Sequence, residues 1–220
     1  MNLVRFTNKI LDRRKFTLKK YAEFLNSIKK YKVVNCRDFQ NYHNPAEVVI
    51  ALRHDIDRNI DHAVSMAVLE AEHGISSTYF VLHSAKYYLL SFDKIRLIQS
   101  LGHEIGIHND VMSTKMPEAT LKLVLRILKW QGLNITGTAA HGNKKHSDNI
   151  GFWKTHDLKD FGLDYEAYFM DYNKYYSDCT FIDYHRWHPE QLYDLTPLGY
   201  KYNFKPGDRI QILTHPEHWR

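Results

Sequence analysis

The sequence predicts an α/β domain built on a parallel sheet, either doubly wound or closed into a barrel. Three observations support this prediction. Short apolar runs alternate along the chain with longer segments of helical periodicity, as in strand–helix–strand units. The run at 48–52, Val-Val-Ile-Ala-Leu, has no polar residue, which is typical of a strand buried on both faces. The 220 residues can also bury a core of their own, so we expect one domain.

The N-terminal part of the chain is expected to form a helical extension of this domain. Apolar and aromatic residues within 17–31 recur at intervals of three and four, and Thr17 is a suitable N-cap. Residues 35–45 are expected to be a connecting loop. Because 1–45 is too short to bury a core alone, we assign 46–220 as the body of the domain and 1–45 as its extension.

Helices and strands alternate through the rest of the chain. Helices are expected at 59–73, where Gly74 supplies the stop, at 91–101, and from Pro117 to Gly132. Strands are expected at 77–82, 104–107, 134–140 and 209–214. The aromatic-rich segment 144–176 has a weaker pattern, and we expect only a short strand near 164–168 within it.

The composition narrows the class of protein. No segment resembles a signal peptide or approaches the roughly 18 apolar residues of a membrane span, so we expect a cytoplasmic protein. Much of the net charge of +5 falls within 9–32. The sequence has no arginine-rich stripe interleaved with aromatic residues, so we do not expect nucleic-acid binding. A nucleotide-linked or phosphorylated sugar would suit this charge. Cys36 and Cys179 are expected to be reduced structural thiols.

Histidine is unusually frequent, and the placement of these residues is informative. Five of the fourteen histidines follow apolar runs, namely His54, His83, His108, His141 and His215. In a parallel barrel all strands end at one rim, so residues far apart in the sequence meet there. Taken singly, each histidine is more easily explained as structural, above all His83, which has no acidic neighbour.

Asp55 and Asp57 follow the apolar run at 48–52. Two close carboxylates repel each other unless a cation lies between them or one is protonated. Asp55 and Asp57 could instead be structural residues that begin the next helix. That explanation accounts for one carboxylate but not for the histidines at other strand ends. Catalytic zinc takes three histidine or carboxylate ligands and lowers the pKa of a bound water to about 7. These residues therefore favour a metal-dependent hydrolase.

Three stretches of the chain resemble the polysaccharide deacetylase family (the NodB-homology or carbohydrate esterase 4 group). They are Arg53-His54-Asp55-Ile56-Asp57, Gly102-His103-Glu104-Ile105-Gly106-Ile107-His108 and Leu213-Thr214-His215-Pro216. The resemblance runs from about residue 48 to the C-terminus, and the first stretch is similar to a subset that opens with Arg-His-Asp-Ile/Val-Asp. It implies a distorted (β/α) barrel of about seven strands, here with an extra N-terminal helix, and metal-dependent hydrolysis of an amide on an amino sugar.

The resemblance also implies roles for individual residues. Asp55 corresponds to the general base, and His215 to the acid that protonates the leaving amine. Asp57 and His108 correspond to metal ligands.

Two features depart from the pattern of the family. Its second histidine ligand would fall at Met112, which is a poor zinc ligand, so we take His141 as the third ligand and Asp110 as the alternative. Its base-orienting arginine would fall at 138–142, where no arginine occurs.

Substrate-binding residues are predicted from the same resemblance. Arg53 or Arg186 could replace the missing arginine. Asp183 with Trp187 resembles the motif that lines the acyl pocket of the family.

We therefore expect a hydrolase that uses zinc or another divalent metal to remove an acetyl or formyl group from an amino sugar. A soluble precursor in surface-polysaccharide biosynthesis, such as a lipopolysaccharide or capsule precursor, is favoured over a polymer outside the cell. Two alternatives remain. One is a metal-free, inactive carbohydrate-binding protein, and the other is a metal-dependent hydrolase of a cyclic amide.

Overall fold

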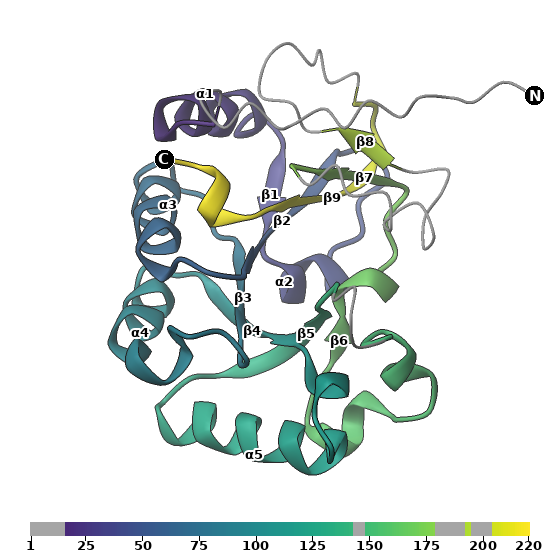
Figure 1. Cartoon of the computed structure of the whole chain (residues 1–220). Coiled ribbons are helices and arrows are strands. Elements are labelled where there is room, and N and C mark those ends of the chain that lie inside the picture. The colour runs from purple at the N-terminus through teal and green to yellow at the C-terminus, as the bar shows by residue number, and fades with distance from the viewer. Residues whose placement is uncertain (1–15, 143–147, 179–191, 195–203) are drawn as a thin grey trace, which may run out of the picture.

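The centre of the molecule is one curled sheet, seen in a computed structural model that describes residues 16–142, 148–178, 192–194 and 204–220 (Figure 1). All strand pairings among these residues are parallel, in the order β6-β5-β4-β3-β2-β9-β7-β8, and β1 pairs with β2 beside this path. With its outer helices the sheet forms a distorted (β/α) barrel, which confirms the predicted fold class. The described residues form nine strands, where about seven were expected.

The strands are short, and those nearest the middle of the sheet are the most deeply buried. Every residue of β2, β3 and β4 is buried, as expected for strands covered on both faces. The bounds are β1 Lys32–Val34, β2 Val49–Ile56, β3 Thr78–Leu82, β4 Glu104–Asn109, β5 Ile135–Ala140, β6 Tyr165–Glu166, β7 Lys174–Ser177, β8 Leu192–Asp194 and β9 Arg209–Thr214.

Among the described residues, four α-helices pack outside the curled sheet and a fifth lies within its curve (Figure 1). The outer helices are α1 Leu18–Ile28, α3 Ile60–Glu72, α4 Phe92–Ser100 and α5 Pro117–Trp130. The expected extra helix, α1, begins at its predicted cap, because the side chain of Thr17 accepts a hydrogen bond from the backbone N–H of Lys20. None of the described helices is long and apolar enough to cross a membrane.

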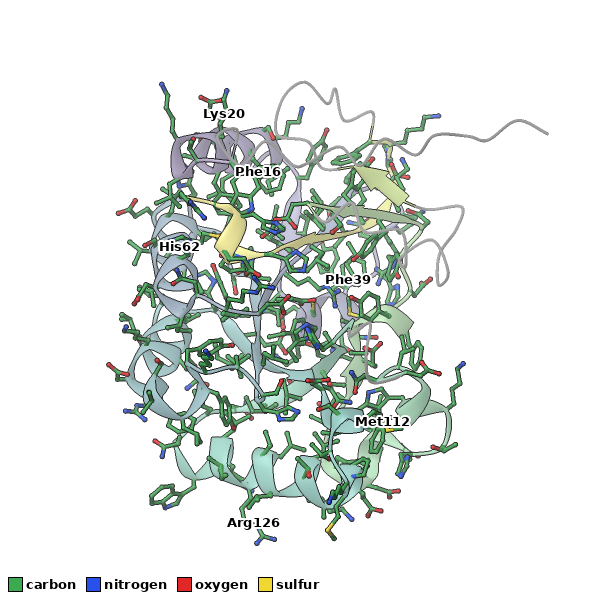
Figure 2. The ribbon with its side chains drawn as sticks, viewed as in Figure 1. Phe16, Lys20, Phe39, His62, Met112 and Arg126 are labelled. Carbon is green, nitrogen blue, oxygen red and sulfur yellow. The ribbon has the colours of Figure 1, made fainter. Side chains whose placement is uncertain are left out.

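The inner helix, α2 Cys36–Asn41, corrects the expectation of a loop at 35–45. This helix is too short to show a clear apolar period, and contacts distant in sequence stabilise it. The backbone N–H of Cys36 donates to Thr78 Oγ1 at 2.8 Å, and that of Arg37 donates to Glu104 Oε2 at 3.0 Å. Figure 2 shows Phe39 of this helix near the centre of the molecule.

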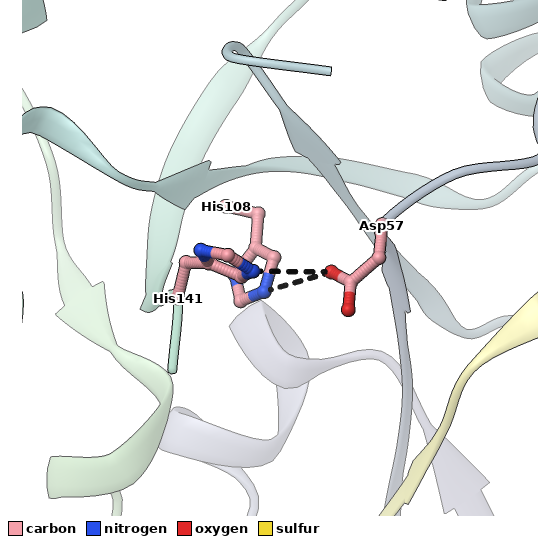
Figure 3. A group of neighbouring side chains, drawn as sticks. All are labelled: Asp57, His108 and His141. Carbon is pink, nitrogen blue, oxygen red and sulfur yellow. Dashed lines mark ion pairs between the residues drawn. The ribbon is translucent and has the colours of Figure 1, made fainter. Parts of the chain in front are cut away.

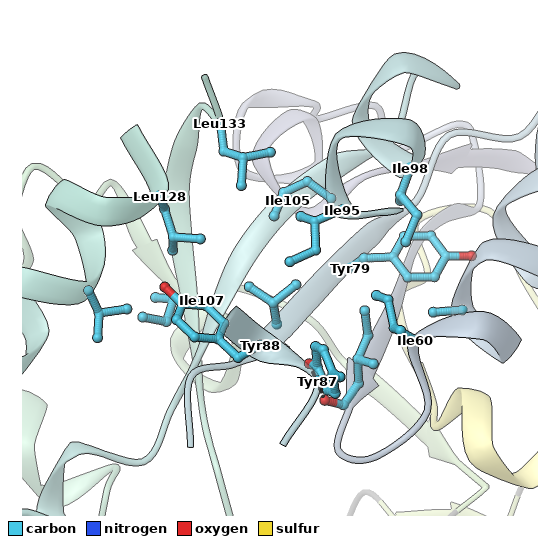
Figure 4. Close-up of a cluster of buried hydrophobic side chains, with 14 of the residues drawn as sticks. Ile60, Tyr79, Tyr87, Tyr88, Ile95, Ile98, Ile105, Ile107, Leu128 and Leu133 are labelled. Carbon is cyan, nitrogen blue, oxygen red and sulfur yellow. Dashed lines mark hydrogen bonds between the residues drawn. The ribbon is translucent and has the colours of Figure 1, made fainter. Parts of the chain in front are cut away.

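Apolar side chains fill both sides of the sheet. Outside it, Tyr79 of β3 and Ile105 of β4 belong to one cluster with apolar residues of α3, α4 and α5, such as Ile95 of α4 (Figure 4). Inside the barrel, Phe39 and Phe80 belong to a separate cluster with buried tyrosines. The strands are therefore fixed from both faces, which holds the residues at their ends in defined positions.

Gly137 of β5 makes room for an aromatic ring inside the barrel. A Cβ atom at this position would lie 2.0 Å from Cζ of Tyr165, and neither the buried ring nor the strand can move away easily. We therefore expect the Gly137→Ala substitution to lower the free energy of unfolding by about 1–3 kcal/mol, the usual cost of overpacking. Chemical denaturation would measure the change.

Gly142→Ala is a matched control for this prediction. None of the described residues comes within 4 Å of a Cβ atom at Gly142, and its backbone is not in the left-handed region. The control should unfold almost as the wild type does. Equal stability of both variants would contradict the close packing of Tyr165 against Gly137.

Candidate active site

Strand β2 carries two sets of polar side chains on opposite faces, because successive side chains of a strand alternate. Arg53 and Asp55 face the barrel interior, where the guanidinium of Arg53 lies 4.4 Å from the ring centroid of Tyr168. His54 faces the outer helices and lies 2.8 Å from Glu70 Oε1 of α3. The expectation that His54 lines the rim with the other histidines is therefore wrong.

Glu70 is the centre of a buried polar cluster on this outer face. Its carboxylate accepts hydrogen bonds from Tyr21 Oη, from Ser77 Oγ at 2.5 Å and from Tyr79 Oη at 2.9 Å. Burial alone would raise the pKa of Glu70, but His54, His103 and the hydroxyl of Ser77 lower it to about 2. His54 also contacts Thr214 Oγ1 at 2.6 Å, so the cluster links α3, β2 and β9.

Asp57, His108 and His141 converge at the C-terminal ends of β2, β4 and β5 (Figure 3). His108 Nε2 lies 3.3 Å from Asp57 Oδ1, and His141 Nε2 lies 3.9 Å from the same oxygen. One ligand atom from each residue lies within 4.8 Å of the others. The structure thus brings together the three residues that were expected to bind the metal, and they could hold an ion.

Contacts at Nδ1 of the two histidines direct Nε2 of each ring toward Asp57. Nδ1 of His108 donates to the carbonyl oxygen of Ala139 at 2.9 Å, which leaves Nε2 available as a ligand. Nδ1 of His141 lies 3.6 Å from Asp110 Oδ1. A carboxylate behind a ligating imidazole commonly fixes its orientation.

Asp110 therefore lies behind His141 and not beside Asp57. Its carboxylate accepts hydrogen bonds from Ser84 Oγ at 2.9 Å and from Asn149 Nδ2 at 3.2 Å. The sequence did not point to Ser84 or Asn149, because neither belongs to a recognisable motif. The geometry gives Asp110 an orienting position, in place of its predicted position as the alternative third ligand.

We expect the Asp110→Asn substitution to weaken the binding of a divalent metal by about 10–100-fold, the usual effect of losing an orienting carboxylate. Competition with a chromophoric zinc chelator would measure the affinity. Asp164→Asn is a suitable control, because Asp164 is exposed and pairs only with Lys159 among the described residues. Unchanged affinity in the Asp110 variant would show that His141 does not depend on this carboxylate.

Electrostatics at the site favour a cation. Burial alone would raise the pKa of Asp57, but His108, His215 and His141 lower it below its ordinary range. Burial lowers the pKa of His108, yet the charges of Asp55 and Asp57 raise it overall. Carboxylates that stabilise the proton of a charged imidazole would also stabilise a metal ion bound to that ring in place of the proton.

Asp55 lies between Arg53 and this group of residues. Its Oδ2 atom is 3.6 Å from Nη2 of Arg53 and 3.6 Å from Nε2 of His108. Its Oδ1 atom is buried and has no hydrogen-bond partner among the described residues. One oxygen of Asp55 thus faces fixed charges, and the other is available to a proton donor.

His215 follows β9 and is held by Asp178, which follows β7. Nδ1 of His215 donates to Asp178 Oδ1 at 2.7 Å, and the backbone N–H of His215 donates to Asp178 Oδ2 at 2.8 Å. Burial lowers the pKa of His215, but Asp178 and, more weakly, Asp57 and Asp55 raise it well above its ordinary value. Sequence analysis missed Asp178, whose only signal is its position after a weakly patterned strand.

The remaining predicted residues are less central or are not described. Met112 is 38% exposed, on the turn that follows β4, and is not part of the converging group. Asp183, Arg186 and Trp187 lie outside the described residues.

Comparisons with known proteins place this geometry on a known fold. The sequence matches no protein-family profile and no curated protein. The structure matches a carbohydrate esterase 4 (CE4) pseudoenzyme from Bacillus anthracis and a mutant of it with restored enzymatic activity, each with a TM-score of 0.50 and 14% identity. It also matches a Streptococcus mutans CE4 esterase, with a TM-score of 0.50 and 12% identity. The chain has the CE4 fold.

The extent of these matches differs between the solved structures. The match with the S. mutans CE4 esterase covers 88% of this chain and 84% of that one. The matches with the pseudoenzyme and its mutant cover 79% of this chain but only 56% and 58% of theirs, so this chain spans less than two thirds of their length. The CE4 fold confirms the resemblance seen in the sequence at the level of architecture.

Proposed function

We propose that the protein is a metal-dependent hydrolase that removes an acetyl or formyl group from the nitrogen of an amino sugar. The observation that carries this proposal is the convergence of Asp57, His108 and His141 beside Asp55. The proposed substrate is a soluble precursor in surface-polysaccharide biosynthesis, such as a nucleotide-linked sugar. The proposed location of the protein is the cytoplasm.

The donor set of this group fits zinc. Two imidazoles and one carboxylate form a usual ligand set of catalytic zinc, which keeps a further position for water or substrate. Asp57 Oδ1 is buried without a hydrogen-bond partner among the described residues, a costly arrangement that a cation would relieve. When bound, zinc or another divalent ion would polarise the acyl carbonyl and lower the pKa of water at the site.

The side chains around the proposed centre have complementary roles in this proposal. Asp55 takes the proton from the attacking water, and Arg53 holds the carboxylate in place from the interior side. His215 gives a proton to the departing nitrogen, and Asp178 keeps its imidazole oriented and protonated. Burial of Asp55 and His215 keeps bulk water away from both proton transfers.

The test combines metal analysis with an assay. Protein purified without chelator should contain a divalent metal and release acetate or formate from at least one member of a panel of N-acetyl and N-formyl amino sugars. A chelator should abolish the release, and added zinc, cobalt or manganese should restore it. Protein that binds none of these metals and hydrolyses no member of the panel would refute the proposal.

A second candidate function is metal-free carbohydrate binding. Two observations favour it, namely the match to a CE4 pseudoenzyme and the methionine, Met112, where the family pattern has a histidine. In that case calorimetry should detect binding of an amino sugar to chelator-treated protein, and added metal should produce no turnover.

A further inference from the structure

We infer that Asp178, His215 and His218 form a second divalent-cation site, and that an ion bound there inhibits the enzyme by occupying the imidazole of His215. The inhibitory effect rests on the proposed function, in which His215 is the acid. The binding site itself does not depend on that function.

The three side chains are placed as metal ligands are. One ligand atom from each lies within 4.8 Å of the others. Nδ1 of His215 is 2.7 Å from Asp178 Oδ1, and Nδ1 of His218 is 3.3 Å from Asp178 Oδ2. His215 precedes the 3₁₀ turn Pro216–His218 and His218 ends it. Side chains three residues apart eclipse one another in such a turn, and the two ring centroids are 5.3 Å apart.

His218 has an unused ligand atom that faces this group. Its Nδ1 atom is buried, and its contact with Asp178 does not have hydrogen-bond geometry, so it has no hydrogen-bond partner among the described residues. A buried polar atom without a partner is costly unless water or an ion satisfies it. A cation between Nδ1 of His218 and the carboxylate of Asp178 would satisfy it.

The carboxylate of Asp178 is held as ligating carboxylates usually are. Its Oδ2 atom accepts hydrogen bonds from the backbone N–H of His215 at 2.8 Å and from Trp219 Nε1 at 3.0 Å. Trp219 is fully buried and packs edge-on against Phe16, with ring centroids 5.0 Å apart. These contacts orient the carboxylate in advance, as outer contacts do at known metal sites.

Ligand chemistry restricts the ion that this site would bind. Two imidazoles and one carboxylate suit zinc, cobalt and similar cations, whereas calcium and magnesium prefer oxygen ligands. The ion would take the place of the proton on Nδ1 of His215, and that proton is released to solvent. The ion must also break the 2.7 Å hydrogen bond from Nδ1 of His215 to Asp178 Oδ1, so we expect weaker binding here than at Asp57, His108 and His141.

Occupation of the second site would remove the acid from the reaction. An imidazole that coordinates a metal through Nδ1 can no longer form the imidazolium that donates a proton to the departing nitrogen. Loss of a general acid typically costs about 10²–10⁴-fold in rate, so saturating the second site should lower hydrolysis by about 10²-fold or more.

The test counts metal ions on the metal-free protein by zinc titration against a chromophoric chelator. The wild type should bind two equivalents, one tight and one weaker, in line with the two groups of ligands. His218→Gln should lose the weaker equivalent and keep the tight one, which also reports that the variant is folded. His62→Gln is the matched control and should keep both, because His62 contacts the carbonyl of Pro216 and neither group of ligands.

The outcomes separate this inference from the proposed function. If the wild type binds a single equivalent of zinc and His218→Gln retains it, the second site is overturned. Two equivalents of zinc bound by His218→Gln would also overturn it. A single equivalent that disappears in His218→Gln but survives in His108→Gln would support the second site and reject the proposed centre. Where hydrolysis is measurable, excess zinc should inhibit the wild type and spare the His218 variant.

Discussion

The Asp55→Asn substitution is expected to lower the rate of the proposed N-acyl hydrolysis by about 10³-fold without loss of the proposed metal. Removal of a general base commonly costs about 10²–10⁴-fold, and asparagine cannot accept the proton of water. Metal content should persist, because Asp55 is not part of the converging group formed by Asp57, His108 and His141. Steady-state rates and elemental analysis of the same preparation would measure both effects.

Two controls make this result specific. Asp61→Asn alters an exposed carboxylate in the first turn of α3 and should leave the rate unchanged. Asp55→Asn also leaves the buried charge of Arg53 without its acidic neighbour, so the unfolding transition of the variant must be recorded. A folded, metal-containing Asp55 variant with wild-type activity would reject Asp55 as the base.

The Glu70→Gln substitution is expected to lower the free energy of unfolding by about 3 kcal/mol at neutral pH. Loss of one member of a buried, hydrogen-bonded charge cluster typically costs about 3–5 kcal/mol. Glutamine keeps the size of the side chain, but its amide cannot replace a carboxylate that faces His54 and two tyrosine hydroxyls. Chemical denaturation at a fixed pH would measure the loss.

The effect of Glu70 should also depend on pH. Its pKa of about 2 in the folded protein lies below its ordinary value of 4.5, so the unfolded state binds more protons. The stabilisation from Glu70 is therefore complete above about pH 4.5 and is lost as the pH falls toward 2. The difference between wild type and Glu70→Gln should shrink over the same interval.

Glu23→Gln on the exposed face of α1 is the control for both measurements. Glu23 pairs with Lys20, and about half of its side chain is exposed. Surface substitutions of this kind usually change stability by less than about 0.5 kcal/mol. An equal loss in the Glu23 and Glu70 variants, or a difference that does not depend on pH, would contradict a special role for the buried cluster.

Much of the fold could be predicted from the sequence, because its longer elements have strong apolar patterns. Strand β2, predicted from the apolar run at 48–52, and helices α1, α3 and α5 occur close to their predicted positions. The short elements β1, α2, β7 and β8 were missed, since three to six residues carry too little periodicity. Contacts distant in sequence stabilise α2 instead, such as that between Arg37 and Glu104.

Residues of the candidate site could be predicted where they follow a strand or belong to a sequence motif. They could not be predicted where only the folded chain brings them close to the site. Asp57, His108 and His141 were expected to meet, and their ligand atoms converge in the structure. Asp178 and Asn149 could not be found from a motif, because their partners lie far away along the chain. Asp178 is 37 residues from His215, and Asn149 is 39 residues from Asp110.

The alternation of side chains along β2 limits how this protein can change. One residue inserted into or deleted from the strand would exchange its faces, moving Arg53 and Asp55 among the helices and His54 into the barrel. Two networks would be lost in a single step, although no side chain had been replaced. Changes of length that preserve both networks are therefore confined to the loops that connect the strands.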